Sequence, residues 1–85
     1  MGRYSTIIME EALILVVLAP SFKTENLEKI RHITGVTAAH LLYGPYDLFA
    51  TIKVKDREEM RALVMEIREM DGIKSTVTCN VIPQR

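Results

Sequence analysis

The sequence of 85 residues predicts an α+β domain, in which one four-stranded antiparallel sheet carries two helices on a single face. Two observations predict this class. Segments with strand-like and helix-like apolar spacing follow one another in the order strand, helix, strand, strand, helix, strand. In addition, Ile30–Val36 and Ile67–Ile73 repeat the pattern Ile-Arg-x-apolar-x-Gly-apolar, typical of a helix that ends at glycine and leads into a strand. Because such crossovers are right-handed, this order predicts the ferredoxin-like βαββαβ arrangement.

The first strand is predicted at Ala12–Ala19, an unbroken apolar run that indicates a central strand and that Pro20 ends. The run is far shorter than the ~20 residues that cross a bilayer, so no transmembrane helix is expected. Residues 1–11 are expected to form an N-terminal arm before a domain at 12–82, with residues 83–85 as a C-terminal tail. For the start of this arm, three alternatives stay open: a mobile segment, a short added strand, or a leader upstream of Met9.

A first helix is predicted after Thr24, whose hydroxyl is expected to accept a hydrogen bond from a free amide of the first turn. Gly35 is expected to end this helix, because glycine adopts the left-handed conformation without strain. The inward face of the helix is expected to carry Leu27, Ile30 and Ile33.

Two further strands are predicted at Val36–Tyr43 and Leu48–Val54, and Tyr43–Asp47 reads as the loop of a hairpin between them. Strict alternation places Val36, Ala38, His40 and Leu42 on one face of the second strand and Thr37, Ala39, Leu41 and Tyr43 on the other. In the third strand, alternation separates Leu48, Ala50, Ile52 and Val54 from Phe49, Thr51 and Lys53. The loop holds two tyrosines and a carboxylate, more functional groups than a turn requires.

A second helix is predicted after Asp56, which forms a variant of the capping box with Glu59. Its apolar stripe consists of Met60, Leu63, Val64, Ile67 and Met70. Methionines on this helix are expected to fill the core or an interface. Gly72 is expected to end the helix, and the last strand is predicted at Ile73–Ile82.

The sheet face opposite the helices is also expected to be apolar. It would carry either the Leu48 set or the Phe49 set, together with members of the group Leu41, Tyr43, Val77 and Cys79. An exposed apolar face of this size predicts a partner, and the simplest one is a second copy of the chain. The apolar content of 48%, high for so small a domain, supports a buried subunit interface.

Composition excludes several classes of partner. Eleven basic residues balance eleven acidic ones without a basic cluster, so the sequence does not indicate direct nucleic-acid binding. The single cysteine, Cys79, is expected to be a small core residue, and with no internal disulfide and no recognisable signal peptide the chain is expected to be cytoplasmic.

Two motifs resemble a known family. Leu41–Leu48, with its Gly-x-Tyr-Asp hairpin, and Gly72–Thr78, with its Ser-Thr-x-Thr strand, are together similar to the effector-binding domain of Lrp/AsnC transcription regulators, called RAM. The resemblance covers roughly residues 12–82 and lacks the helix-turn-helix of that family. It implies a stand-alone RAM module of the dimeric α+β barrel type, which dimerises through its sheets and forms rings, often octamers. It also implies an amino-acid effector in clefts between dimers and, as a possible partner, a full-length Lrp/AsnC regulator.

The resemblance carries Gly44, Tyr46 and Asp47 into the ligand site, joined by Ser75, Thr76 and Thr78, while Pro45 departs from many relatives. Asp47 suits the ammonium of an amino acid, amides around Gly44 suit its carboxylate, and Tyr46 suits the wall of a side-chain pocket. Ordinary structural roles compete with these. The Asp47 carboxylate would equally bond nearby backbone amides, and the tyrosines would equally pack in the hairpin or at an interface.

The sequence predicts no catalysis, no cofactor and no metal site, since it has no phosphate loop, no nucleophile beside a base, and no cluster of metal ligands. Two alternatives to an amino-acid sensor stay open. One is an adaptor that co-assembles with a full-length regulator without any ligand. The other is a small dimeric ferredoxin-like enzyme that uses His40 as a base.

Overall fold

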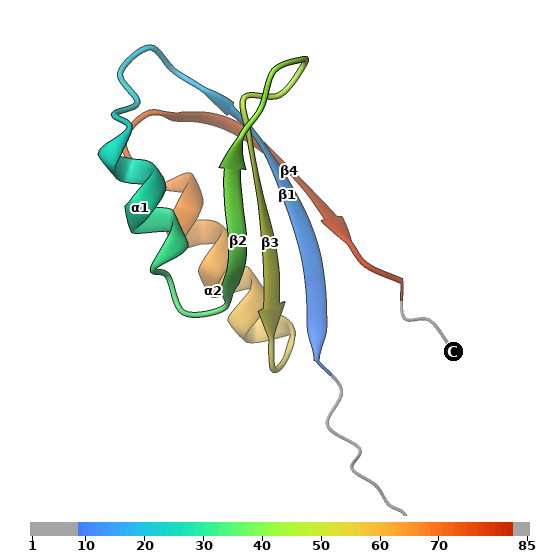
Figure 1. The fold of residues 1–85 in the computed structure, drawn as a ribbon. Coiled ribbons are helices and arrows are strands. Elements are labelled where there is room, and N and C mark those ends of the chain that lie inside the picture. Colours follow the sequence, from blue (N-terminus) through green and yellow to red (C-terminus); the bar gives the residue numbers. More distant parts are fainter. Residues whose placement is uncertain (1–8, 83–85) are drawn as a thin grey trace, which may run out of the picture.

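The computed structural model describes residues 9–82, which form one antiparallel sheet with both helices on the same face (Figure 1). The elements are β1 (Glu10–Leu18), α1 (Glu25–Arg31), β2 (Val36–Leu41), β3 (Leu48–Val54), α2 (Arg57–Arg68) and β4 (Ile73–Asn80). The strand order is β2-β3-β1-β4, so β1 is central as predicted. The ferredoxin-like βαββαβ fold is therefore confirmed.

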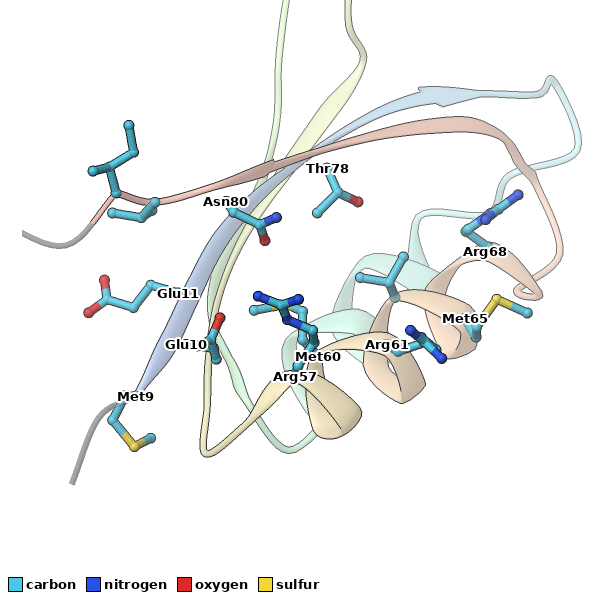
Figure 2. A pocket seen from close by; sticks show the side chains of 13 residues that line it. Met9, Glu10, Glu11, Arg57, Met60, Arg61, Met65, Arg68, Thr78 and Asn80 are labelled. Atoms are coloured by element: carbon cyan, nitrogen blue, oxygen red, sulfur yellow. The ribbon is translucent and has the colours of Figure 1, made fainter.

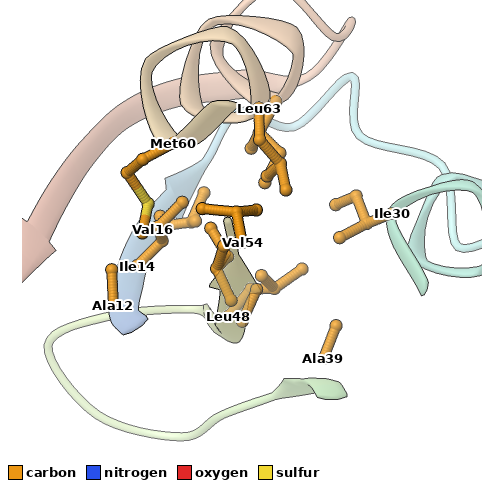
Figure 3. Packing of buried hydrophobic residues seen from close by; sticks show 12 residues of the cluster. Ala12, Ile14, Val16, Ile30, Ala39, Leu48, Val54, Met60 and Leu63 are labelled. Atoms are coloured by element: carbon orange, nitrogen blue, oxygen red, sulfur yellow. The ribbon is translucent and has the colours of Figure 1, made fainter. Parts of the chain in front are cut away.

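The core lies between the helices and the sheet (Figure 3). Alternation along β3 buries Leu48, Ala50, Ile52 and Val54 against the helices. The apolar stripe of α2 packs on them as predicted. Ile30 is the fully buried contribution of α1. The buried apolar residues are Ala12, Ile14, Val16, Ile30, Ala39, Leu48, Ala50, Ile52, Val54, Met60, Leu63 and Ile67.

Strict alternation was wrong for β2. The pairing of β2 with β3 shifts between Val36 and Ala38, so Val36 pairs with Ile52 while Ala39 pairs with Ala50. Ile52 and Ala50 are both buried on the helix side, and the irregularity therefore places Val36 and Ala39 on the same face. An extra residue in one strand reverses the alternation that follows it.

The ends of three strands also differ from the prediction. Strand β1 begins at Glu10, inside the segment expected as an arm, because Glu10 and Glu11 pair with residues of β3. It ends at Leu18, since the next amide, that of Ala19, donates a hydrogen bond to the Gly72 carbonyl at 2.8 Å. Strand β2 ends at Leu41 and β4 at Asn80, two residues before each predicted end. For β2 the partner strand begins there, since Leu41 pairs with Leu48, the first residue of β3.

The two helix starts behave differently. Asp56 caps α2 as predicted: the Glu59 amide donates to Asp56 Oδ1 at 2.9 Å, and the Lys55 amide donates to Glu59 Oε1 at 3.0 Å. Thr24 was expected to cap α1 and does not, because its backbone is already helical and its side chain accepts no amide. A cap needs an extended backbone, which Asp56 has at φ −153° and Thr24 lacks.

The repeated glycines lie one turn beyond the helices rather than at their last residue. The helices end at Arg31 and Arg68, and Gly35 (φ 102°) and Gly72 (φ 90°) then lead into β2 and β4. Ile33 and Met70, in the intervening turns, still pack on the core. The repeat therefore predicts the turn correctly and the helix end a few residues too late.

Replacing Asp56 by alanine is expected to lower the free energy of unfolding by about 1 kcal/mol, since it leaves the Glu59 amide without its acceptor. Urea denaturation followed by circular dichroism measures this. Glu66→Ala, on the exposed surface of the same helix, is the control and should change stability by less than ~0.5 kcal/mol. Equal stability of the Asp56 variant and the wild type would contradict the capping role.

The sheet face away from the helices is largely apolar. Leu13, Leu15 and Val17 alternate with the buried residues of β1. Their partners are Thr51 and Phe49 of β3 and Cys79, Val77 and Ser75 of β4. We call this surface the open face, and Ala38 and His40 continue it on β2. Cys79 is thus exposed on the open face rather than in the core as expected, and Leu41 is in register with the helix-side residue Leu48.

Candidate functional site

The hairpin loop is fastened to the end of the central strand by Asp47. Its amide donates to the Val16 carbonyl at 2.8 Å, and its Oδ2 accepts from the Leu18 amide, also at 2.8 Å. The Leu42 amide donates to the Asp47 carbonyl at 2.8 Å and closes the base of the loop. The Asp47 carboxylate therefore does bond a backbone amide, but that of Leu18, on a strand distant in sequence, rather than one of its own turn.

A hollow of about 530 Å³ opens beside this carboxylate. It lies between the end of β1 and the arms of the hairpin, and it is lined by Leu18, Ala19, Pro20, Leu41, Leu42, Tyr43 and Asp47. Asp47 is half-buried, and within residues 9–82 its Oδ1 has no hydrogen-bond partner. Apolar walls with one carboxylate suit a small ligand that carries an ammonium group and an apolar side chain.

The other predicted hairpin residues lie around this hollow rather than in its lining. Gly44 is exposed at φ 127°, and a side chain there would meet nothing within 4 Å, so the backbone is open to approach. Tyr46 is half-buried, while Tyr43 is fully exposed and does line the hollow.

The predicted residues of β4 are only partly brought to this site. Ser75 pairs with Val17, so it lies at the same end of the sheet as Asp47, on the other side of β1. Thr76 and Thr78 pair with Val16 and Ile14 on the helix side. Thr78 lines a separate hollow between α2 and β4. One copy of the chain therefore does not gather the six predicted residues into one cavity.

The apolar lining of this hollow was not predicted from the sequence. It comes from the end of β1 and the residues that follow it, and from the hairpin beside them. Pro20 was read as the end of a strand and Leu41 as part of a sheet face. The signal that links them is the Leu18–Asp47 hydrogen bond, which joins residues 29 positions apart and is not visible in a local pattern.

His40 offers little as a base. It is exposed on the open face, with its ring centroid 5.5 Å from that of Phe49 and its Nδ1 3.4 Å from Arg31 Nη2. Among residues 9–82, no group of three or more His, Cys, Asp or Glu is placed to hold a metal ion. In the same part of the chain, no helix is long and apolar enough to cross a membrane.

The fold agrees with comparisons to known proteins. Residues 11–84 match the profile of the Lrp/AsnC ligand binding domain. The chain belongs to this family. The resemblance to the RAM domain is thereby confirmed, and the family is one of regulatory ligand-binding domains rather than of catalysts.

Solved RAM structures match nearly the whole chain. The crystal structure of FFRP-DM1 superposes with a TM-score of 0.79 at 31% identity and covers 86% of this chain and 99% of its own. A protein of Pyrococcus horikoshii superposes with a TM-score of 0.78 at 29% identity, covering 91% and 93%. A Neisseria meningitidis transcriptional regulator crystallised with L-Met shares the fold at a TM-score of 0.75 and 14% identity.

Curated relatives are longer. A helix-turn-helix-type transcriptional regulator of Pyrococcus horikoshii is 36% identical over 55 residues, which is 64% of this chain and 37% of the regulator. The homocitrate synthase of Sulfolobus acidocaldarius is 30% identical over 61 residues, which is 72% of this chain and 13% of the enzyme, in its C-terminal RAM domain. The chain thus spans 37% of the length of the regulator and 13% of the length of the enzyme. RAM domains typically self-associate and bind small effectors.

Proposed function

We propose that the domain is an amino-acid-sensing and oligomerisation module, which binds a free amino acid at the hairpin hollow and contributes to transcriptional regulation of amino-acid metabolism. The observation that carries this proposal is the Asp47 carboxylate in an otherwise apolar hollow, since only its Oδ2 accepts a hydrogen bond within residues 9–82. Membership of a ligand-binding family supports it, as does the L-Met complex of the Neisseria regulator with the same fold.

The open face is the proposed dimer interface. Its central residues Leu13, Leu15, Val17 and Phe49 are only half-buried in one copy, and Val77 is 44% exposed. Pairing two such faces would remove this apolar surface from water, at about 25 cal/mol for each Å² buried. Dimers of this kind would assemble into a ring, an octamer or another closed number of dimers, with the hairpins at the boundaries between dimers.

Within the proposed site, Asp47 Oδ1 would accept from the ligand ammonium while Oδ2 stays on the Leu18 amide. Amides around Gly44 would bind the ligand carboxylate, with Tyr43 or Tyr46 against the side chain. Ser75 would approach from the far side of β1. The hydroxyls of Thr76 and Thr78 face the helices, so they would take part only from a neighbouring copy.

A second function is favoured by the regulator relatives, of which this chain spans 37%. The open face would then pair with the RAM domain of a full-length regulator and alter its assembly, with no ligand bound. The two functions differ in their response to amino acids, which only the first requires.

A thermal-shift screen of the standard amino acids separates the two functions. An amino acid that binds only the folded state, at a hundred times its Kd, is expected to stabilise the domain by about 2.7 kcal/mol and raise Tm by about 10 °C or more. Because the site is shared between dimers, size-exclusion chromatography with light scattering should also detect a change in assembly. An unchanged Tm and mass with every amino acid would contradict the sensor and favour the adaptor.

A further inference from the structure

A second groove lies on the helix side of the sheet, between α2 and β4, with a volume of about 720 Å³ (Figure 2). Arg57, Arg61 and Arg68 line it from the helix, and Thr78 and Asn80 line it from the strand. Arg68 also borders an adjoining hollow of about 250 Å³ at the beginning of β4, beside Lys74, Ser75 and Thr76. The two hollows together follow most of the length of β4.

The arginines form a segregated stripe of positive charge. Their spacing of four and then seven residues places them on one side of α2, facing β4. Within residues 9–82 none of the three makes an ion pair or a hydrogen bond, and no acidic residue of α2 lines the groove. Like charges at such spacing destabilise a helix slightly. The three arginines outnumber the two carboxylates, Glu10 and Glu11, that also line the groove, so the stripe is suited to an external anion.

The opposite wall offers the hydrogen-bonding groups of a free strand edge. In the described part of the chain, β4 pairs with β1 on one side and with no strand on the other. An unpaired edge is a template for an added strand. Thr78 and Asn80, whose side chains extend toward α2 in Figure 2, have no side-chain hydrogen bond within residues 9–82.

The spacing of the arginines indicates the shape of the ligand. At 1.5 Å per residue, Arg57 and Arg68 are about 16 Å apart along the helix, too far for a single carboxylate or phosphate to bridge. Arg57 and Arg61 are about 6 Å apart, close to the ~6.6 Å between alternate side chains of an extended strand. An anion with charges spread along a strand therefore fits better than a compact one.

We propose that this groove binds an extended acidic peptide segment of another protein. The segment adds to the free edge of β4 and directs alternate Asp or Glu side chains toward Arg57, Arg61 and Arg68. Glu10 and Glu11 line the groove near the end of β4, and Lys53 pairs with Glu11 at 3.9 Å. These carboxylates favour an N-terminal segment that runs antiparallel to β4, because its free ammonium would then lie at the glutamate end. The proposal stands independently of the amino-acid site.

The test uses the full chain and a fluorescent heptapeptide of alternating glutamate and valine with a free N-terminus, followed by anisotropy. We expect saturable binding that weakens with salt, as contacts between charges do. The double variant Arg57→Gln/Arg61→Gln should bind about tenfold more weakly or worse, since it loses charge-assisted hydrogen bonds. Lys23→Gln/Lys29→Gln, which removes two exposed charges on the α1 side, is the matched control and should bind like the wild type.

Further binding experiments distinguish strand addition from charge attraction alone. A peptide with N-methyl groups on alternate amides cannot pair along β4 and should lose most of the binding. Absence of binding by the acidic peptide would overturn the proposal. So would equal binding by the N-methylated peptide, or equal binding by the arginine variant with its circular dichroism and Tm unchanged. Tighter binding of an oligodeoxythymidylate of equal charge, lost in the same arginine variant, would instead assign the groove to nucleic acid.

Discussion

Gly72→Ala is expected to lower the free energy of unfolding by about 2–4 kcal/mol, among the largest effects of any single methyl group in this chain. Gly72 has φ 90°, where an L-residue is strained. A Cβ at this position would also collide with the Cα of Phe22 and lie 2.8 Å from its Cβ and its amide nitrogen. Because backbone cannot move aside as a flexible side chain can, the turn and its hydrogen bond to Ala19 should both shift. Urea denaturation measures the loss.

Gly44→Ala is the matched control for that substitution. Its φ of 127° is also unfavourable for alanine, but an added Cβ there meets nothing within 4 Å. The Gly44 variant should therefore show only the backbone strain, about 1–2 kcal/mol. If Gly72→Ala were no less stable than Gly44→Ala, the close packing of Phe22 on this turn would be contradicted.

Leu15→Glu is expected to dissociate the proposed assembly into single chains. Leu15 lies in the middle of the open face, paired with Phe49 on one side and Val77 on the other. In a face-to-face dimer the new carboxylate would be buried without a partner, at a cost of several kcal/mol. In a single copy it would remain partly in contact with water. Light scattering after size-exclusion chromatography should show the mass fall to that of one chain, 9.7 kDa.

The control for this variant is Ala62→Glu, which places the same carboxylate on the exposed surface of α2. It should leave the mass unchanged. An unchanged mass for Leu15→Glu in a folded protein would contradict the open face as the interface. A wild type that is already a single chain would contradict the dimer itself.

The parts of the fold that follow from local patterns could be predicted from the sequence. Alternation in β3, the apolar stripe of α2 and the Asp56 cap each depend on residues within a few positions of one another, and each is confirmed. The repeated glycines likewise report a local requirement for positive φ, which both positions meet.

Features that depend on pairing between distant residues could not be predicted in this way. The irregularity in β2 follows from its register against β3, and it places Val36 and Ala39 on one face, where strict alternation separates them. Cys79 lies in an apolar strand, but its register with Leu13 turns it to the open face. Thr24 has the right side chain for a cap, but the preceding turn already sets its backbone in the helical region.

The candidate site likewise combines a feature visible in a local pattern with features that depend on residues far apart in sequence. The Gly-x-Tyr-Asp motif drew attention to the hairpin, and the resemblance implied a ligand there. The second Asp47 oxygen is fixed by Leu18, and the arginine groove is formed by α2 and an edge strand. Both arrangements become visible only when segments far apart in sequence are folded together.

Calorimetric titration of the domain with the amino acid that raises Tm most tests the central claim most directly, when wild type is compared with Asp47→Asn. Asparagine keeps an acceptor for the Leu18 amide and removes the charge intended for the ligand ammonium. We predict saturable heat with the wild type and about tenfold or greater loss of affinity in the variant, with the assembly mass unchanged. Equal affinity of the two proteins, or no saturable heat with any amino acid, would contradict an amino-acid site at this hairpin.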